Sequence, residues 1–251
     1  MMKNNNSLSL GFNYDSWYGY GRKEAVVTDI SASTNSHVIL SGISGSGKSY
    51  ALIRLMKMLS LAEVLKGKIY FADFKQDDSF AFLRKCSYYY PYKQSVEALE
   101  QVYAILHRRQ SGEDEERYPV TLIWDEYMAN ILALQGEDKK RAVNAMNKVS
   151  EILMLGRSLA VRFVCVCQAP YAHAFPDGSR LNYGVIMVLG APMRSIYEML
   201  LPKECIDKVE DRQFGRGEGV VLLQGSELHF VKVPMVRDVE EMQKICIEAL
   251  S

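Results

Sequence analysis

Short apolar runs along the chain alternate with longer segments in which apolar residues recur every three or four positions. A short apolar run predicts a buried strand, and the longer spacing predicts an amphipathic helix. Strands are expected at residues 37–41, 68–73, 120–126, 162–168 and 184–190, and helices at 48–65, 95–109, 138–158 and 239–250. The apolar stretch 220–233 predicts a hairpin that turns at Gly225 and Ser226.

Strands that are apolar throughout and separated by helices are typical of a mainly parallel sheet with helices on both faces. The sequence therefore predicts an α/β fold that ends in a C-terminal hairpin. With 251 residues, the chain is long enough for one large domain. The first 35 residues are instead polar with interspersed aromatic residues, and they lead into the turn-like sequence SASTNS. We therefore expect an N-terminal segment at 1–35 and one domain at 36–251.

Composition and charge narrow the class of protein. Hydrophobic residues make up 48% of the chain and charged residues 24%, as in folded globular proteins rather than disordered chains. The 30 Lys and Arg residues are balanced by 30 Asp and Glu residues, which excludes an overall basic surface but not a locally basic groove or pore. Five scattered cysteines show no metal-binding spacing and predict reduced thiols. Without an apolar signal sequence or a membrane-spanning run, a cytoplasmic protein is expected.

Residues 42–49, with the sequence GISGSGKS, match the G-x-x-x-x-G-K-[ST] pattern of a phosphate-binding P-loop. Glycines allow the backbone N–H groups to point inward at phosphate oxygens, and the N-terminus of the following helix adds positive partial charge. Lys48 is expected to reach the β- and γ-phosphates of ATP, and Ser49 to ligate Mg²⁺. The expected nucleotide-binding residues are Gly42, Ile43, Ser44, Gly45, Ser46, Gly47, Lys48, Ser49 and Tyr50.

Two adjacent acids, Asp125 and Glu126, follow the apolar run that starts at Val120. An acid at the end of a strand beside the P-loop can hold Mg²⁺ through water, and a following glutamate can activate the attacking water. We therefore assign Asp125 to the metal site with Ser49, and Glu126 to catalysis as the general base. The alternative is an acid pair that caps the next helix. Gln168, at the end of another expected strand, can bond both the γ-phosphate and the water, although an ordinary polar strand end has the same appearance.

Taken in order, these segments resemble the motor domain of FtsK/SpoIIIE-type DNA translocases, within the HerA/FtsK group of P-loop ATPases. The resemblance extends from about residue 36 to about residue 235. Besides the P-loop and the acid pair, it includes Asp73-Phe74-Lys75, the helix end His107-Arg108-Arg109, the segment 156–170 and the late glycine turn Gly215-Arg216-Gly217-Glu218.

The resemblance implies a RecA-like core, assembly of identical subunits into a ring that is usually hexameric, and ATP-driven movement of double-stranded DNA through the pore. It also implies that Gln168 senses the γ-phosphate. Arg157 matches an arginine of the family, and we expect it to act catalytically on the nucleotide of a neighbouring subunit. Arg162, Arg194 and Arg216 are the other candidates for that role, and a surface arginine is the alternative for each.

The sequence departs from the family at two positions, because Phe74 replaces a proline and Ala169 stands in place of an arginine. No membrane segment or winged-helix extension is evident, so we expect a compact member of the group, such as one from a mobile element, localised by a membrane or recruitment partner protein. The tyrosine-rich segment 87–93 is a candidate nucleic-acid contact, or else packs over the core. Two alternative functions stay open: a type VII-like protein-secretion ATPase, and a nucleotide-binding assembly scaffold with slow turnover.

Overall fold

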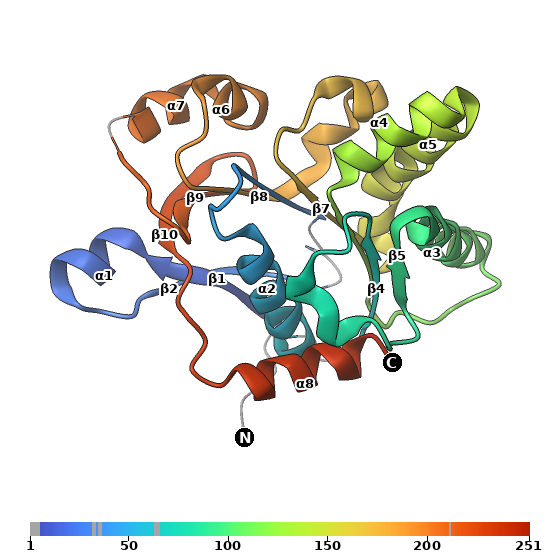
Figure 1. Cartoon of the computed structure of the whole chain (residues 1–251), viewed down its shortest axis with the longest axis horizontal. Helices are drawn as coiled ribbons and strands as arrows, with labels where there is room; N and C mark the ends of the chain where they lie inside the picture. The colour runs from blue at the N-terminus through green and yellow to red at the C-terminus, as the bar shows by residue number, and fades with distance from the viewer. Residues whose placement is uncertain (1–5, 32–33, 35–36, 63–65, 211) are drawn as a thin grey trace.

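A ten-stranded sheet runs through the molecule and carries helices on both faces (Figure 1). The computed structural model describes residues 6–31, 34, 37–62, 66–210 and 212–251. Within them the strand order is β2-β1-β10-β9-β8-β3-β7-β6-β4-β5. The expected α/β fold is confirmed.

Six neighbouring strands, from β8 to β5 in the sheet order, are parallel to one another. They are β3 (His37–Gly42), β4 (Lys68–Asp73), β5 (Tyr89–Pro91), β6 (Val120–Asp125), β7 (Val161–Cys167) and β8 (Tyr183–Leu189). Every residue of β3, β6 and β7 is buried, because these central strands have helices over both faces. Five parallel strands were predicted, each with ends within one residue of those observed, whereas the three-residue β5 was not expected.

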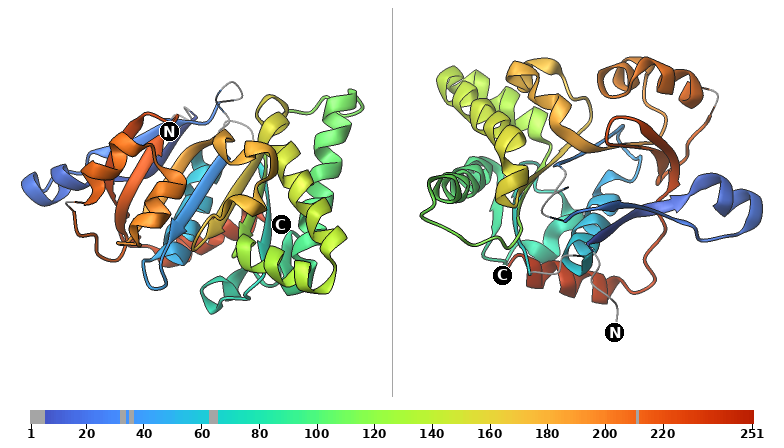
Figure 2. Two further views of the ribbon diagram at one scale, coloured as in Figure 1. Left: turned by 90° about the horizontal axis from the view of Figure 1, so that it is seen from above. Right: turned by 180° about the vertical axis from the view of Figure 1, so that it is seen from behind.

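The helices enclose two separate apolar cores, one on each face of the sheet (Figures 1 and 2). One face is covered by α2 (Lys48–Ala62) and α8 (Val239–Ala249), and Leu52 and Met56 of α2 are fully buried there. The other face carries α3 (Ser95–Ser111), α4 (Tyr127–Glu137), α5 (Lys139–Leu155), α6 (Arg194–Leu200) and α7 (Lys203–Glu210). Trp124 of β6 and Tyr127 of α4 pack edge-to-face in this second core.

The antiparallel half of the sheet contains the predicted hairpin, which consists of β9 (Glu218–Leu223) and β10 (Glu227–Lys232). It also contains two strands that were not expected. β1 (Ser7–Asn13) pairs with β10, β2 (Ala25–Asp29) pairs with β1, and α1 (Tyr14–Tyr20) connects them. Part of the N-terminal segment therefore belongs to the central sheet, and the domain boundary at residue 35 stays a prediction.

Helix ends differ from the expected ones where capping residues intervene. Asp138 accepts a hydrogen bond from the N–H of Arg141 and starts α5, which separates it from the unexpected α4. The helix expected at 48–65 ends at Ala62, and residues 63–65 lie outside the described part, as do 32, 33, 35 and 36 of the SASTNS turn. The remaining elements are single-turn or short 3-10 helices: η1 (Asp78–Leu83), η2 (Tyr92–Gln94), η3 (Gly156–Leu159), η4 (Ala172–Ala174) and η5 (Pro176–Asn182).

Two further expectations can be compared with the structure. In the tyrosine-rich segment, Tyr89 and Tyr90 are buried in β5, which agrees with packing over the core; Tyr92 stays half-exposed and stacks on Phe74. Among the described residues, no helix has both the length and the apolar character needed to cross a bilayer.

Candidate nucleotide-binding site

The P-loop joins the carboxyl end of β3 to the first residue of α2. Its turn depends on Gly45 and Gly47, whose φ angles of 79° and 95° lie in the left-handed region. Lys48 Nζ donates hydrogen bonds to the carbonyl oxygens of Gly42, at 2.7 Å, and Ile43, at 3.2 Å. The ammonium group therefore lies against the curved backbone of the loop.

A cavity of about 260 Å³ opens beside this loop, at the carboxyl ends of the parallel strands. It brings together most of the predicted site residues: Ser44, Gly45, Gly47, Lys48, Ser49, Tyr50, Asp125, Glu126 and Gln168. Gly42 and Ser46 are buried in the loop, whereas Ile43 is exposed. The cavity is also lined by Lys75, Asp77 and Arg216, which the sequence motifs did not assign to nucleotide binding.

Asp125 is the last residue of β6 and is only 6% exposed. It lies opposite Asp73, the last residue of β4, in the parallel ladder. Burial, followed by the negative charges of Glu126, Asp73 and Asp77, raises the pKa of Asp125 to about 8, while Lys48 acts in the opposite direction. A cation at this position would relieve the repulsion between the carboxylates.

The residues around Asp125 fit Mg²⁺ bound together with a nucleotide. Asp125 and Ser49 line the same cavity and offer a carboxylate and a hydroxyl, both hard oxygen donors. No group of three or more His, Cys, Asp or Glu side chains placed to hold a metal occurs in the described part of the chain. In phosphate-transfer enzymes, one or two protein ligands to Mg²⁺ are usually completed by phosphate and water.

Glu126 has φ 54° and ψ 42°, a left-handed conformation that is uncommon for a residue other than glycine. This conformation occurs where β6 turns sharply into α4, and the side chain lines the cavity next to Asp125. Glu126 is the N-cap residue of α4, but its side chain makes no capping hydrogen bond. The alternative that this residue caps the next helix is therefore not supported. Strained backbone of this kind is concentrated at functional sites.

Lys48 lines the same cavity as Asp125 and Glu126. Burial lowers the pKa of the Lys48 ammonium, whereas the charges of Glu126 and Asp125 raise it. The balance of these opposing effects is a pKa below the ordinary value for lysine.

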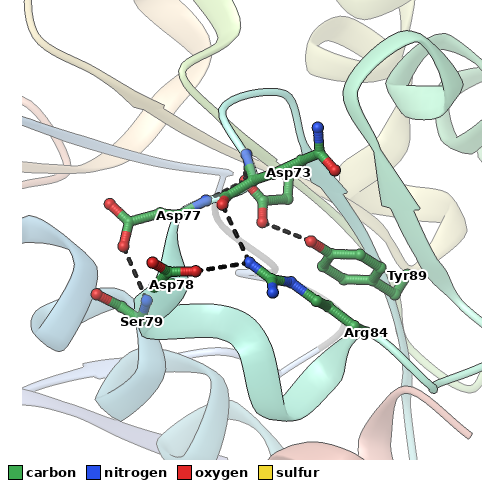
Figure 3. A network of polar contacts seen from close by, with 7 residues as sticks. Asp73, Asp77, Asp78, Ser79, Arg84 and Tyr89 are labelled. Atoms are coloured by element: carbon green, nitrogen blue, oxygen red, sulfur yellow. Dashed lines mark hydrogen bonds and ion pairs between the residues drawn. The ribbon is translucent and has the colours of Figure 1, made fainter.

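The loop after β4 is held by a polar network around Asp73 (Figure 3). Asp73 is fully buried and accepts hydrogen bonds from the N–H groups of Gln76, at 2.7 Å, and Asp77, at 3.4 Å. The hydroxyl of Tyr89 donates to its other oxygen, at 2.7 Å. Arg84 donates to the carbonyl oxygen of Gln76, at 3.3 Å. These contacts fix the loop that places Lys75 and Asp77 in the cavity.

Gln168 follows β7 directly, and its side chain is exposed toward the cavity. Its carbonyl oxygen accepts a hydrogen bond of 2.9 Å from the Ser41 hydroxyl, which ties the ends of β3 and β7 together. Arg157 lies before the other end of β7, in η3, and its exposed side chain lines a separate cavity of about 580 Å³. Its role toward a neighbouring subunit stays a prediction.

The other three candidate arginines differ in their burial and in their position relative to the cavity. Arg162 is fully buried in β7 and donates a hydrogen bond of 3.2 Å to Thr121 Oγ1. The suggestion that Arg162 reaches the nucleotide of a neighbouring subunit is therefore wrong. Arg194 is exposed and forms an ion pair of 2.9 Å with Glu198. Arg216 lines the nucleotide cavity of its own chain. Sequence spacing could not show this, because the contact depends on the tertiary approach of a segment about 170 residues from the P-loop.

No model of a known protein family matches the chain. Among curated proteins, the FtsK domain-containing protein YdcQ of Bacillus subtilis (strain 168) is 24% identical over 205 residues, which cover 72% of this chain. The match covers 40% of YdcQ, so less than half of this relative is aligned with the chain. The resemblance to FtsK-type P-loop ATPases is confirmed.

Solved structures agree on the fold of this FtsK-like chain. The pCW3 conjugation coupling protein TcpA, in its monomer form with ATPγS, is 19% identical with a TM-score of 0.70, over 97% of this chain and 70% of TcpA. The cytoplasmic domain of the type VII secretion ATPase EccC from Thermomonospora curvata is 17% identical with a TM-score of 0.69, over 100% of this chain and 32% of EccC. The fold is therefore that of RecA-like P-loop ATPases.

Proposed function

We propose that this FtsK-like chain is an ATP-hydrolysing motor that moves or couples double-stranded DNA as part of a ring of identical subunits. The observation that carries the proposal is the meeting of Lys48, Asp125 and Glu126 in one cavity beside the P-loop. A scaffold that only binds nucleotide has no need of a strained glutamate at this position. The paired acids therefore favour hydrolysis over the scaffold alternative.

Each side chain has a distinct task in this proposal. Lys48 binds the β- and γ-phosphates and stabilises the charge that develops on them. Glu126 accepts a proton from the water that attacks the γ-phosphorus, while the bond to the bridging oxygen of ADP breaks. Gln168 orients this water. Mg²⁺, held by Ser49 and Asp125, would supply charge neutralisation on the phosphate oxygens.

Assembly and cargo are inferred from the relatives. The names of YdcQ, an FtsK domain-containing protein, and TcpA, a conjugation coupling protein, support DNA as the cargo. The ring, which we propose is hexameric, follows from the resemblance of the motifs to those of FtsK-type motors. Arg157 would then act on the nucleotide of the neighbouring subunit. The second candidate is polypeptide transport, which is favoured by the similarity to EccC, including a structure of its ATPases 2 and 3 in complex with a signal sequence peptide.

The test is steady-state ATP hydrolysis by the purified protein, with and without linear double-stranded DNA. We expect DNA to stimulate hydrolysis. Lys48→Ala is expected to abolish ATP binding. Glu126→Gln is expected to keep ATP affinity and lose about 100-fold or more in turnover, the usual contribution of a general base. Lys57→Ala in α2 and Glu137→Gln in α4 are matched controls, because these residues lie on the same helices outside the cavity.

Each outcome bears on one part of the proposal. Hydrolysis that does not respond to DNA would reject DNA as the cargo and favour polypeptide transport. An active Glu126→Gln protein would refute the assignment of the base. ATP binding without hydrolysis by the wild-type protein would favour the scaffold alternative.

A further inference from the structure

The segment before β9 presents Arg216 to the nucleotide cavity and packs directly on the P-loop. The N–H of Gly217 donates a hydrogen bond of 2.8 Å to the carbonyl oxygen of Ser46. A Cβ atom added to Gly47 would lie 3.2 Å from the Gly217 nitrogen and 3.5 Å from Arg216 Cγ. The P-loop and the segment before β9 are therefore in close contact. Because Arg216 belongs to that segment, the contacts that fix the segment also fix the position of Arg216 beside the P-loop.

Glu218 closes this segment on its C-terminal side. One carboxylate oxygen accepts the N–H of Gly215, at 2.8 Å, and the other accepts Lys232 Nζ, at 2.8 Å, and the hydroxyl of Tyr18. Burial alone would raise the pKa of Glu218, but the hydrogen bonds from Lys232, Tyr18 and Gly215 outweigh burial and lower it. Glu218 is thus an ionised group, 8% exposed, whose partners include a residue of α1.

The same helix also holds the N-terminal side of the segment. The Asp15 carboxylate accepts two hydrogen bonds from the Arg212 guanidinium, at 2.7 and 3.2 Å. The Tyr14 ring packs edge-on against Phe214, with 5.9 Å between the ring centroids. α1 therefore contacts Arg212, which precedes Arg216 in the sequence, and Glu218, which follows it. More than 190 residues separate α1 from both partners.

We propose that Arg216 binds the phosphates of ATP in its own subunit, and that Glu218 and α1 are positioning elements for it. The proposal rests on the function proposed above, because it requires ATP in the cavity. Arg216 lines the same cavity as Lys48, and its guanidinium would add a second cation with a fixed fork of donors suited to phosphate. The N-terminal segment then contributes to the nucleotide site, because displacement of α1 would remove the contacts of Tyr18 and Asp15 with the segment that carries Arg216.

The test is titration of the full chain with a fluorescent ATP analogue. Arg216→Ala is expected to raise the Kd roughly tenfold, the usual effect of losing a charge-assisted hydrogen bond. Tyr18→Phe removes only the hydroxyl and is expected to raise the Kd roughly threefold. Asp15→Asn, at an exposed side chain, is expected to act in the same direction through Arg212. Tyr20→Phe is the matched control on the same helix, since its ring is 76% exposed.

A double variant separates positioning from a general loss of structure. When Arg216 is already alanine, Tyr18→Phe is expected to have no further effect on the Kd, because Tyr18 acts through Arg216. An equal effect in both backgrounds, or no effect of Tyr18→Phe and Asp15→Asn, would refute the positioning role. An unchanged Kd in Arg216→Ala would refute the binding role while Lys48→Ala still abolishes binding. Failure of the wild-type protein to bind the analogue would overturn the proposed function itself, and this inference with it.

Discussion

The strand that leads into the P-loop begins with a buried histidine, and this predicts a specific sensitivity of the fold to acid. His37 is 2% exposed, and its Nδ1 accepts the N–H of Phe163 in β7, at 3.0 Å. An imidazole nitrogen that accepts a hydrogen bond is unprotonated, so the ring is neutral. Burial, followed by the positive charges of Arg162 and Arg157, lowers the pKa of His37 from 6.5 to about 3.

The direction of the effect follows from this lowered pKa. In the unfolded chain the imidazole is protonated below its ordinary pKa of 6.5, whereas in the folded protein it stays neutral down to about 3. The unfolded state therefore binds more protons within this range, and the folded state loses stability as the pH falls through it. Between about pH 7 and about pH 4.5, His37 alone is expected to lower the free energy of unfolding by about 2.5 kcal/mol.

The variant His37→Asn isolates this contribution. The Asn side-chain oxygen can accept the N–H of Phe163 as Nδ1 does, but the amide does not titrate. Urea unfolding is measured for the wild-type protein and the variant at a series of pH values. The variant is expected to lose about 2.5 kcal/mol less over the range between about pH 7 and about pH 4.5. A constant difference in stability between the two proteins does not affect this comparison.

Parallel curves of unfolding free energy against pH for wild type and His37→Asn would refute the assignment of a neutral buried imidazole. His173→Asn is the matched control, because His173 is exposed. This control is expected to keep the wild-type dependence on pH.

Two further predictions concern other buried groups. Arg109→Ala is expected to lower the free energy of unfolding by about 3 kcal/mol in urea titrations. The substitution removes a buried cation that donates a hydrogen bond to the Leu159 carbonyl oxygen and pairs with Asp114. A loss below about 1 kcal/mol would contradict this. A thiol reagent is expected to modify only Cys86 quickly in the native protein, since Cys86 is partly exposed and the other four cysteines are buried. Fast modification of two or more thiols would contradict the burial of those four cysteines.

The central part of the fold could be predicted because its signal is local. β3 and β7 are buried on both faces, so their sequences are apolar throughout and stand out from the flanking helices. The hairpin of β9 and β10 is joined by a short turn at Gly225, which is also visible locally.

The N-terminal strands could not be predicted in the same way. Along β2 only alternate residues are buried, and β1 contains serine, glycine and asparagine. Both are strands because β1 pairs with β10, where Phe12 lies opposite Lys232. Such a pairing is fixed by tertiary contacts rather than by the propensity of the segment itself.

The same distinction between local sequence signals and tertiary contacts applies to the residues of the candidate site. Lys48 and Asp125 belong to motifs whose spacing follows from the strand–loop–helix geometry around a phosphate, so the sequence alone assigns them. Asp73 needs the ladder between β4 and β6, which places it opposite Asp125. Arg216 needs the contact of Gly217 with Ser46. Residues that enter a site through sheet register or loop packing leave no fixed spacing in the sequence.

The position of Arg157 constrains the arrangement of subunits in the proposed ring. Arg157 precedes β7, whereas Gln168 follows it at the nucleotide cavity, and a strand of seven residues is about 23 Å long. An arginine at the far end of this strand cannot reach the phosphates of its own subunit. If Arg157 acts in catalysis, one subunit must therefore turn the amino-terminal edge of its parallel strands toward the P-loop of the next. That contact joins two different surfaces of the chain. Repetition of such head-to-tail contacts gives a ring where the rotation between subunits closes, as the proposed assembly requires, and not a two-fold dimer.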